Sequence, residues 1–533
     1  MTGRAPVTGR GNDAPAGTAA LRHGTDYRVL PLGGGGDGGD GDHSGTAAVL
    51  ITGNHRLLLA PAATARRLEA GEDHLLPDER TAWERLRAEA GVGDDTHRTL
   101  LAESALSDGA DFAVNVNLTN VCNLACSYCF AEGGDYGRIT EAMGEHSVAW
   151  IFDFIATHAA PGQRVRFEFF GGEPLANLPV IRTVCERARG VAERDGTRFL
   201  YRVSTNLTLL PPGTTELFRE YGFIVSVSID GGRQVQDANR PSKSGRGSYD
   251  RILRNLRRVR AECGDAVTLV ARMTITTAEP RLRDSVRDLW RLDLFDHFQI
   301  YPGVYPVRTG TTVPVALTLG DRTLSEPQGG IRYINHFLQP GIVEQFKEFL
   351  ADYPNLFDPG NRFQGVLEYE RTVQMISEGA AALAFCSGGR AYYTHSPDGS
   401  VSPCHRLVGD EDFDVGTGDR GITREHPEWR RSVDEHPVCG GCWARYLCGG
   451  GCRQENHVAT GDLNTLNPES CQYQLMLAEE VVKMLARATT AYRNRSRTRY
   501  DDLFVSCGRP VVPSTRAAAP APAGDYTPFR LIC

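Results

Sequence analysis

Three cysteines within eight residues, Cys122, Cys126 and Cys129, have the type and spacing that point most directly to chemistry. They lie in the stretch NLTNVCNLACSYCFAEGG, just after a run predicted to be a strand. An odd number of thiols does not suit a framework of disulfides. A structural zinc site takes four ligands, and no histidine or fourth cysteine lies nearby in the sequence. Three thiolates on one loop suit instead an iron–sulfur cluster that leaves one metal corner to another ligand.

Seven further cysteines gather between residues 386 and 471. They are Cys386, Cys404, Cys439, Cys442, Cys448, Cys452 and Cys471. A zinc ribbon is the simpler explanation of such a group, but seven cysteines fit its four-ligand site poorly. Clustered cysteines in a reducing compartment usually bind metal or carry out redox chemistry. This region therefore predicts further metal clusters.

Composition excludes several other classes of function. The chain has 533 residues, 41% hydrophobic residues, a formal net charge of −8 and 14 cysteines. Its arginines are spread along the chain, which argues against a nucleic-acid partner. No apolar run approaches the roughly 18 residues needed to span a membrane, and the first residues lack the apolar core of a secretory signal. We therefore expect a cytoplasmic protein with reduced cysteines.

Alternating strands and helices between residues 110 and 310 position the first cysteine loop. Strands are predicted at 112–118, 164–170, 199–205, 223–229, 267–275 and 297–302, with amphipathic helices such as 144–158 and 248–263 between them. Six β–α units in a row predict an α/β fold with a parallel sheet, and a barrel-like closure is favoured over an open sheet. Chemistry in such folds lies at the carboxyl ends of the strands. The cysteine loop directly follows the first of them.

The flanking segments divide the chain further. Residues 1–24 are predicted to be disordered, and residues 25–100 form a small α+β unit with a Gly-rich insertion at 33–42. This unit is either a structural appendage or a module that binds a peptide along a sheet edge. A helical bridge is expected at 311–385, the cysteine-rich region at 386–480, and a closing helix with a mobile Pro/Ala-rich tail at 481–533.

In the context of this alternating region, the C-x3-C-x2-C triad resembles that of the radical S-adenosylmethionine (radical SAM) enzymes. The sequence GGEP at 171–174 matches the cofactor-binding turn of that family. The resemblance implies that Cys122, Cys126 and Cys129 hold a [4Fe–4S] cluster, and that the cofactor's methionyl group takes the free iron. One electron would then release a 5′-deoxyadenosyl radical, which abstracts a substrate hydrogen.

The resemblance also implies a set of cofactor-binding residues at the strand ends. These are Tyr128, Gly171, Gly172, Glu173, Pro174, Ser204, Asn206, Ser228, Asp230, Arg240 and Arg272. Glu173 would accept a hydrogen bond from the methionyl amine, although a plain strand-to-helix turn explains GGEP equally simply. Arg240 and Arg272 would pair with a carboxylate of the cofactor or the substrate, or form surface ion pairs.

The seven later cysteines are similar to the SPASM extension of radical enzymes that modify peptides. That resemblance assigns Cys439, Cys442, Cys448 and Cys471 to one complete auxiliary [4Fe–4S] cluster. Cys386, Cys404 and Cys452 would hold a second cluster. Its fourth position is left to a substrate thiolate, or to Cys507 or Cys533.

The whole resemblance covers about residues 25–480. It implies a partial (β/α)6 TIM-like radical SAM barrel between a winged-helix-like peptide-recognition domain and a SPASM domain. PCHRLVGDEDFDVG and CFAEGGDYGR resemble the thioether-forming maturases of ribosomally made peptides. We therefore expect a maturase that joins a precursor cysteine sulfur to a carbon atom. Its partners would be the precursor peptide and a flavodoxin- or ferredoxin-type electron donor.

Three alternatives remain open at this stage. Cross-linking of an aromatic ring through a C–C or C–O bond uses the same cysteine motifs. Formylglycine-forming sulfatase maturases carry an Asp after an auxiliary cysteine, where this chain has His405; that histidine is either a proton acceptor or structural. A non-catalytic iron–sulfur electron carrier would leave GGEP and the six β–α units unexplained.

Overall fold

The protein is described by a computed structural model. The structure describes residues 22–24, 26–32, 45–53, 55–90, 111–129, 131, 133–134, 141–276, 281–308, 318–319, 322–323, 331–335, 341–488, 511–512 and 530–531. The predictions of disorder at 1–24 and of a Gly-rich insertion at 33–42 fall almost entirely outside these ranges, as do Cys507 and Cys533.

A parallel sheet forms the centre of the molecule, as predicted. Its six successive strands are β4 (Phe112–Asn117), β5 (Val165–Phe170), β6 (Phe199–Thr205), β7 (Ile224–Ser228), β8 (Thr268–Ile275) and β9 (His297–Pro302). Helices α4 (His146–His158), α5 (Leu178–Asp195), α6 (Thr214–Tyr221), α7 (Arg233–Asn239), α8 (Tyr249–Cys263) and α9 (Leu282–Trp290) connect them. The predicted α/β class and all six predicted strands are confirmed.

The sheet extends beyond these six strands at both edges. Short strand β14 (Gly365–Val366) pairs in parallel with β9, and β16 (Tyr392–His395) pairs in parallel with β4. Strands β17 (Ser400–Ser402), β18 (Gly416–Thr417) and β19 (Gly421–Ile422) continue it in antiparallel fashion. The described strands run in one open order from β14 to β19, so the sheet does not close on itself. The cysteine-rich region thus supplies strands to the central sheet.

Alternation along the strands separates an apolar outer face from a polar inner face. Leu269, Ala271 and Met273 of β8 belong to the large hydrophobic core beneath the helices, whereas Arg272 and Thr274 point the other way. The same period puts further polar side chains on the inner face: Asn115, Asn117, Arg166, Glu168, Arg202, Ser204, Ser226, Ser228, Gln299 and Tyr301. The strands therefore build a polar interior at which the cysteine loop arrives.

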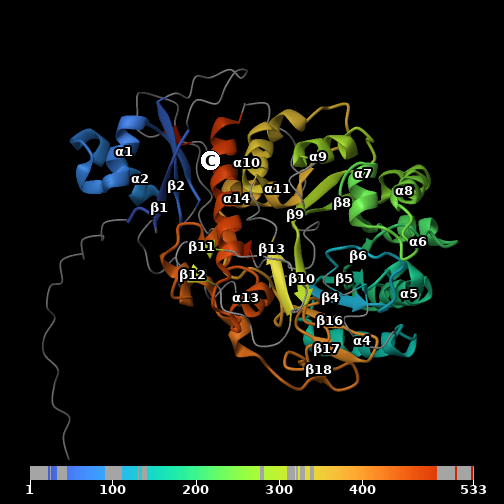
Figure 1. Cartoon of the computed structure of the whole chain (residues 1–533). Coiled ribbons are helices and arrows are strands. Elements are labelled where there is room, and N and C mark those ends of the chain that lie inside the picture. Colours follow the sequence, from blue (N-terminus) through green and yellow to red (C-terminus); the bar gives the residue numbers. More distant parts are fainter. Residues whose placement is uncertain are drawn as a thin grey trace, which may run out of the picture.

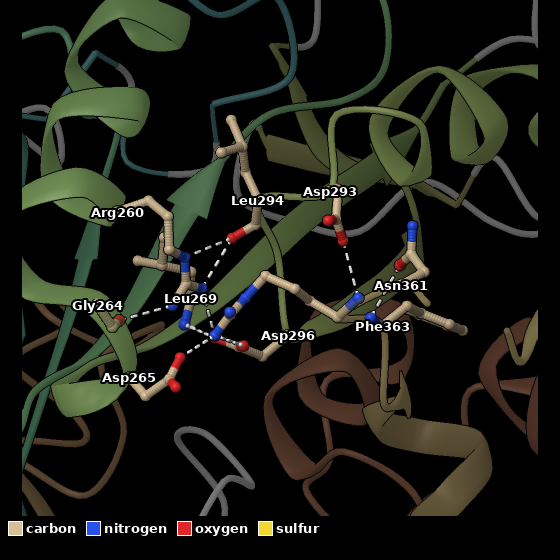
Figure 2. Close-up of polar contacts among 10 residues, drawn as sticks. Arg260, Gly264, Asp265, Leu269, Asp293, Leu294, Asp296, Asn361 and Phe363 are labelled. Carbon is tan, nitrogen blue, oxygen red and sulfur yellow. Dashed lines mark hydrogen bonds and ion pairs between the residues drawn. The ribbon is translucent and has the colours of Figure 1, made fainter. Parts of the chain in front are cut away.

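A network of charged side chains holds the amino-terminal ends of β8 and β9 together (Figure 2). Asp296 lies just before β9 and accepts from Arg260 of α8 at 2.7 Å and from the Leu269 N–H at 2.7 Å. Arg362 adds an ion pair to its other oxygen at 3.3 Å. The Arg260 and Asp296 side chains are only 10% and 6% exposed. The network fixes the end of the sheet away from the cysteine loop.

The amino-terminal unit is a small sheet with two helices. Strands β1 (Tyr27–Pro31), β2 (Thr46–Ile51) and β3 (Leu57–Pro61) are antiparallel, and α1 (Ala62–Ala70) and α2 (Pro77–Ala90) follow. Trp83, Leu68 and Tyr27 are buried in a separate core beneath them. The described strand β21 (Arg530–Leu531) pairs antiparallel with β3. This part of the tail, expected to be mobile, occupies the edge of the amino-terminal sheet.

Helices and short strands fill the remaining described region. Strand β10 (Val304–Arg308) follows β9, and the predicted bridge contains β11 (Thr318–Leu319), β12 (Arg322–Thr323), β13 (Ile331–Asn335), α10 (Ile342–Asp352), α11 (Leu367–Glu378) and β15 (Ala381–Ala382). Strand β20 (Val511–Val512) pairs with β15, and α12 (Arg445–Cys448) and α13 (Arg453–Thr460) lie in the cysteine-rich region. Among the described residues, no helix is both long and apolar enough to cross a membrane.

Helix α14 (Pro468–Arg487) joins the parts of the molecule. It begins earlier than predicted, because Asn467 caps its first N–H groups and Pro468 suits the first turn. It packs on α10 and α11 and also contacts β2 and β3 (Figure 1). An ion pair between Arg28 and Glu479 at 3.8 Å and a bond from the Trp443 N–H to the Gly24 carbonyl connect the amino-terminal unit to the rest.

Candidate functional site

The cysteine loop is held against the sheet by backbone hydrogen bonds. It leaves β4 at its carboxyl end, as predicted, and the N–H groups of Ala125 and Ser127 donate to the carbonyls of Pro241 and Asn239. The Asn206 amide donates to Sγ of Cys122 at 3.7 Å, and the Gly133 N–H donates to Sγ of Cys129 at 3.3 Å. Donors to sulfur favour thiolates, which are the form that binds iron.

Gly171 and Gly172 are required by the packing of this loop. A Cβ on Gly171 would lie 2.5 Å from the Thr119 carbonyl oxygen, and one on Gly172 would lie 2.3 Å from the Val121 carbonyl oxygen. Gly171 also has a φ of +128°, which disfavours any side chain. The two glycines therefore let the end of β5 lie directly beneath the backbone that carries Cys122.

Glu173 is fully buried and already has three hydrogen-bond donors. Its carboxylate accepts from the Thr205 hydroxyl at 2.6 Å, the Asn206 N–H at 2.8 Å and the Leu175 N–H at 3.1 Å. Burial raises its pKa to about 7, against these hydrogen bonds, which lower it. Glu173 thus ties the end of β5 to the end of β6. Neither it nor Pro174 lines the cavity described below.

Behind the cysteine loop, Tyr128, Asp230 and Arg240 form a buried polar cluster. Arg240 makes a bidentate ion pair with Asp230 at 2.9 and 3.0 Å, and the Tyr128 hydroxyl donates to the same carboxylate. The Arg240 guanidinium also lies 5.1 Å from the centre of the Tyr128 ring. Asp230 is completely buried. Arg240 therefore neutralises a protein carboxylate, while one side of it and of Tyr128 lines the cavity.

The three cysteines of the loop influence one another electrostatically. Burial raises the pKa of Cys122 and raises that of Cys126 to about 11, and each is raised further by Cys129. Buried thiols so close together stay protonated unless a cation stabilises their thiolates. This donor set fits an iron–sulfur cluster held by three ligands.

The seven later cysteines separate into the two sets predicted from the sequence. Burial raises the pKa of Cys404, and Cys452 and Cys386 raise it further. Burial likewise raises the pKa of Cys439 to about 12, with Cys448, Cys442 and Cys471 adding to the effect. The first set has three cysteines and the second has four.

The donor chemistry of both sets fits iron–sulfur clusters. Such clusters take cysteine thiolates, each on a different iron. One set offers three thiols and the other offers four.

One cavity of about 310 Å³ connects the loop cysteines to the first later set. At one end its lining includes Cys122, Cys126, Cys129, Gly171, Gly172, Ser204, Asn206, Ser228, Arg240 and Arg272. At the other end it includes Cys386, Cys404, Cys452, His405, Arg406 and Trp429. The structure thus brings most predicted cofactor residues to one cavity that three later cysteines also line. The four-cysteine set does not line it.

His405 is buried beside the cavity and held in place. Its Nδ1 lies 2.9 Å from the Tyr392 hydroxyl, and its ring centre lies 5.1 Å from that of Phe170. Burial lowers its pKa well below the usual value, and Arg406 and Arg272 lower it further. The imidazole is therefore neutral at pH 7. It retains a proton poorly once it has accepted one.

Several lining residues were not singled out in the sequence, notably Tyr301, Glu368, Glu455, Tyr473 and Gln474. Tyr301 lies at the carboxyl end of the last predicted strand. The expectation that functional side chains lie at such strand ends, which pointed to Ser204 and Ser228, could therefore have identified Tyr301 as well. Glu368 is on α11 and the last two are on α14. No local pattern links these helices to the cavity, because only the tertiary packing brings them there.

Comparisons with known proteins agree with this geometry. Residues 116–276 match the family model described as Radical SAM superfamily. The "Serine-type anaerobic sulfatase-maturating enzyme" of Klebsiella aerogenes is 33% identical over 138 residues, which are 25% of this chain and 33% of that protein. The chain thus spans about a third of the length of the first curated relatives it matches.

A longer match and a solved structure extend the similarity over a larger share of the chain. The "Cysteine-type anaerobic sulfatase-maturating enzyme" of Clostridium novyi is 24% identical over 70% of this chain and 96% of that protein. The solved structure "Native anSMEcpe with bound AdoMet" has a TM-score of 0.54 at 19% identity, covering 72% of this chain and all of that chain. At this identity the structural similarity concerns the fold.

Proposed function

Because residues 116–276 match the Radical SAM superfamily model, we propose that this chain oxidises a ribosomally made precursor peptide by joining a cysteine sulfur of the peptide to a carbon atom of another residue. The bound cluster and S-adenosylmethionine would supply the reactive radical that removes a hydrogen from that carbon. The observation that carries the proposal is the single cavity between the loop cysteines and the set Cys386, Cys404 and Cys452.

The chain's own residues would hold both partners of the bond in this cavity. Ser204, Asn206 and Ser228 offer polar groups beside the loop cysteines for the cofactor, and Arg272 offers a guanidinium for a carboxylate. The three-cysteine set leaves one ligand position of a four-iron cluster for a thiolate of the peptide. Trp429, Phe385 and Leu477 supply apolar lining that excludes water.

The amino-terminal sheet is proposed to hold the leader part of the peptide. An extended peptide can add to a sheet edge through backbone hydrogen bonds. Strand β3, whose outer side is paired with β21 in this structure, contacts α14. Ser470, Tyr473 and Gln474 of α14 line the cavity. A peptide added at this edge would therefore have a short path to the cavity.

Formylglycine formation on a sulfatase is a second candidate, favoured by the printed names of the relatives. In both reactions a cysteine-containing peptide loses hydrogen. They differ in the product, because an aldehyde replaces the sulfur in one and a sulfur–carbon bond forms in the other. In this chain His405, and not an aspartate, follows Cys404. Aromatic C–C or C–O cross-linking of a peptide is a third outcome that the test separates.

The test is anaerobic reconstitution with iron and sulfide, followed by incubation with dithionite, S-adenosylmethionine and a synthetic cysteine-containing precursor peptide. The expected products are deoxyadenosine and a peptide lighter by two hydrogens with one fewer alkylatable thiol. The same mass loss with every thiol free would indicate an aromatic cross-link, and an aldehyde that reacts with hydrazine would indicate formylglycine.

Two cysteine variants provide the matched comparison. Cys126→Ala is expected to lose iron and to form no deoxyadenosine, because it removes one ligand of the loop set. Cys263→Ala, at a buried cysteine of α8 far from the cavity lining, is expected to keep both. A wild-type protein with full iron content that never forms deoxyadenosine would overturn the proposal.

A further inference from the structure

The cavity contains one carboxyl group that the chemistry described so far does not use. Glu368 lies in the first turn of α11 and lines the cavity, with only 7% of its surface exposed. Its Oε2 accepts a hydrogen bond from the Ile300 N–H of β9 at 3.3 Å. Its Oε1 is buried and makes no hydrogen bond of normal geometry within the described part of the chain.

The side chains around this carboxyl come from the inner face of the sheet. Tyr301 and Gln299 of β9 lie beside Glu368, and the Gln299 amide donates to the Tyr301 hydroxyl. Burial raises the pKa of Tyr301 well above its usual value, and Arg272 of β8 and Arg202 of β6 act weakly in the opposite direction. A buried carboxyl with an unused oxygen in a cavity has a cost in stability, which suggests a functional role.

Any of the proposed peptide oxidations must dispose of a proton. Joining sulfur to carbon removes two hydrogens from the peptide: one leaves as a hydrogen atom from carbon, in the adenosylmethionine chemistry. The other would leave the thiol as a proton, and a cluster held by the later cysteines would accept the remaining electron as the sulfur–carbon bond forms. A basic group that lines the cavity can accept that proton directly from the substrate.

We propose that Glu368 is the catalytic base that takes the proton of the substrate thiol. The inference rests on the proposed peptide oxidation and holds equally for thioether and formylglycine products. The other candidate bases are engaged: Glu455 pairs with Arg406 at 2.6 Å and accepts from the Ser470 hydroxyl, and His405 is bound to Tyr392.

The ionisation of Glu368 suits this role. Burial raises its pKa to about 7, while the Ile300 N–H and the side chains of Tyr301 and Gln299 act in the opposite direction. A base with a pKa near the working pH combines a useful ionised fraction with enough basicity to take a proton. Tyr301, whose own pKa is raised by burial and by Glu368, keeps its proton and serves as a neighbouring hydrogen-bond donor.

The test compares Glu368→Gln with wild-type protein, in the holoenzyme and with the same precursor peptide. Deoxyadenosine formation should continue in the variant, whereas cross-linked peptide should fall at least tenfold, so that cofactor cleavage becomes uncoupled from product. The wild-type kcat/KM should rise with pH to a plateau, with a midpoint near 7. The variant should lack this rise, and Glu368→Asp should restore part of it.

A control and a substrate-free measurement complete the experiment. Glu370→Gln changes a buried carboxyl of the same helix that accepts from Tyr353 at 2.8 Å and does not line the cavity; it should keep coupling and pH profile. Infrared difference spectra of wild type against Glu368→Gln should reveal a protonated carboxyl band that disappears with a midpoint near pH 7.

The outcomes separate the two proposals. A Glu368→Gln protein with wild-type coupling and pH profile would overturn the role of Glu368 and leave the thioether reaction standing. An aldehyde product together with uncoupling in the variant would overturn the thioether and support Glu368. Absence of the titrating carboxyl band would count against Glu368 even if no peptide were modified.

Discussion

At the residue scale, the site depends on groups whose chemistry is set by burial. The side chains in question are the ten clustered cysteines, Glu173, Glu368, Glu469 and His405, and they lie largely out of water. Wherever the pKa of one of these groups is shifted, burial is the largest cause. The cost of burying these groups is offset in different ways. A bound cation would stabilise the thiolates, and three hydrogen-bond donors stabilise the Glu173 carboxylate. Glu368 lines the cavity, and its Oε1 has no hydrogen bond among the described residues.

Glu173→Gln should weaken the site by disturbing its architecture. An amide presents one acceptor oxygen and one donor group to three donors, so one N–H or O–H loses its partner at a cost of about 1–3 kcal/mol. We expect a lower unfolding midpoint and weaker S-adenosylmethionine binding, measured by calorimetry. Glu186→Gln, an exposed change on the neighbouring helix α5, should alter neither.

The same residue makes stability depend on pH. The Glu173 pKa is raised to about 7 in the folded chain from an ordinary 4.5. As pH rises between these values, the unfolded carboxyl ionises first, so the folded state loses stability by up to about 3 kcal/mol. Urea unfolding should therefore show a smaller penalty for Glu173→Gln at pH 8 than at pH 5. An equal penalty at both values would contradict the raised pKa.

Sequence patterns predicted the residues of the site better than their contacts. Cysteine clustering pointed to all ten candidate ligands, since ligands on short loops keep a local signature, and the resemblance to the SPASM extension implied the two later sets. Strand ends located Ser204, Ser228 and Arg272 in the same way. The ion pair of Arg240 with Asp230 and the role of Glu173 as a tie between strands depend on side-chain direction, which spacing does not encode. Glu368 was missed for a related reason, since α11 reaches the cavity through tertiary packing.

At the element scale, the six strands were predictable because each is a short apolar run with β-branched and aromatic residues between helical patterns. The strands that extend the sheet at its two edges, β14 and β16 to β19, could not be predicted in this way. Strand β16 pairs with β4, although the other strands β5 to β9 all lie between the two along the chain. The four residues of β16 contain no pattern that indicates this partner. For the same reason α14 could be predicted as a helix, but not as the wall of the cavity.

The network in Figure 2 gives an element-scale prediction. Asp296→Ala removes the acceptor of Arg260 and of the Leu269 N–H, leaving a nearly buried guanidinium unpaired. Breaking a buried pair in this way costs about 3–5 kcal/mol, so the thermal midpoint should drop markedly. Asp250→Ala is the matched control, because its pair with Arg233 is about 60% exposed on both sides and contributes little. Equal midpoints for the two variants would show that the network does not anchor β8 and β9.

At the scale of the whole molecule, the chain's last described strand lies on its first domain. Strand β21 occupies the edge of β3, which is also the edge proposed for the leader peptide. Two segments cannot pair with one edge at once. The carboxyl-terminal strand and a leader bound there should therefore compete.

Deleting residues 529–533 tests that competition. Backbone amides of Leu58 and Leu59, which face Leu531 and Arg530 in the register, should exchange with deuterium faster in the shortened protein. Amides of Val49 and Leu50 in the central strand β2 are the internal control and should be unaffected. Leader peptide should bind more tightly to the shortened protein and restore slow exchange. Unchanged exchange at β3 would mean that β21 does not protect this edge in solution.

Helix α14 has a practical consequence for handling the protein. Its 20 residues, about 30 Å of continuous helix, carry Cys471 of the four-cysteine set, four residues of the cavity lining and, through Glu479, the contact to Arg28. If the four-cysteine set holds a cluster, as the resemblance implies, loss of its iron would free Cys471 in the first turn of this helix. Oxidation by air should therefore weaken peptide binding as well as damage the proposed redox centres. A preparation that has lost its iron colour to oxygen should lose peptide binding first.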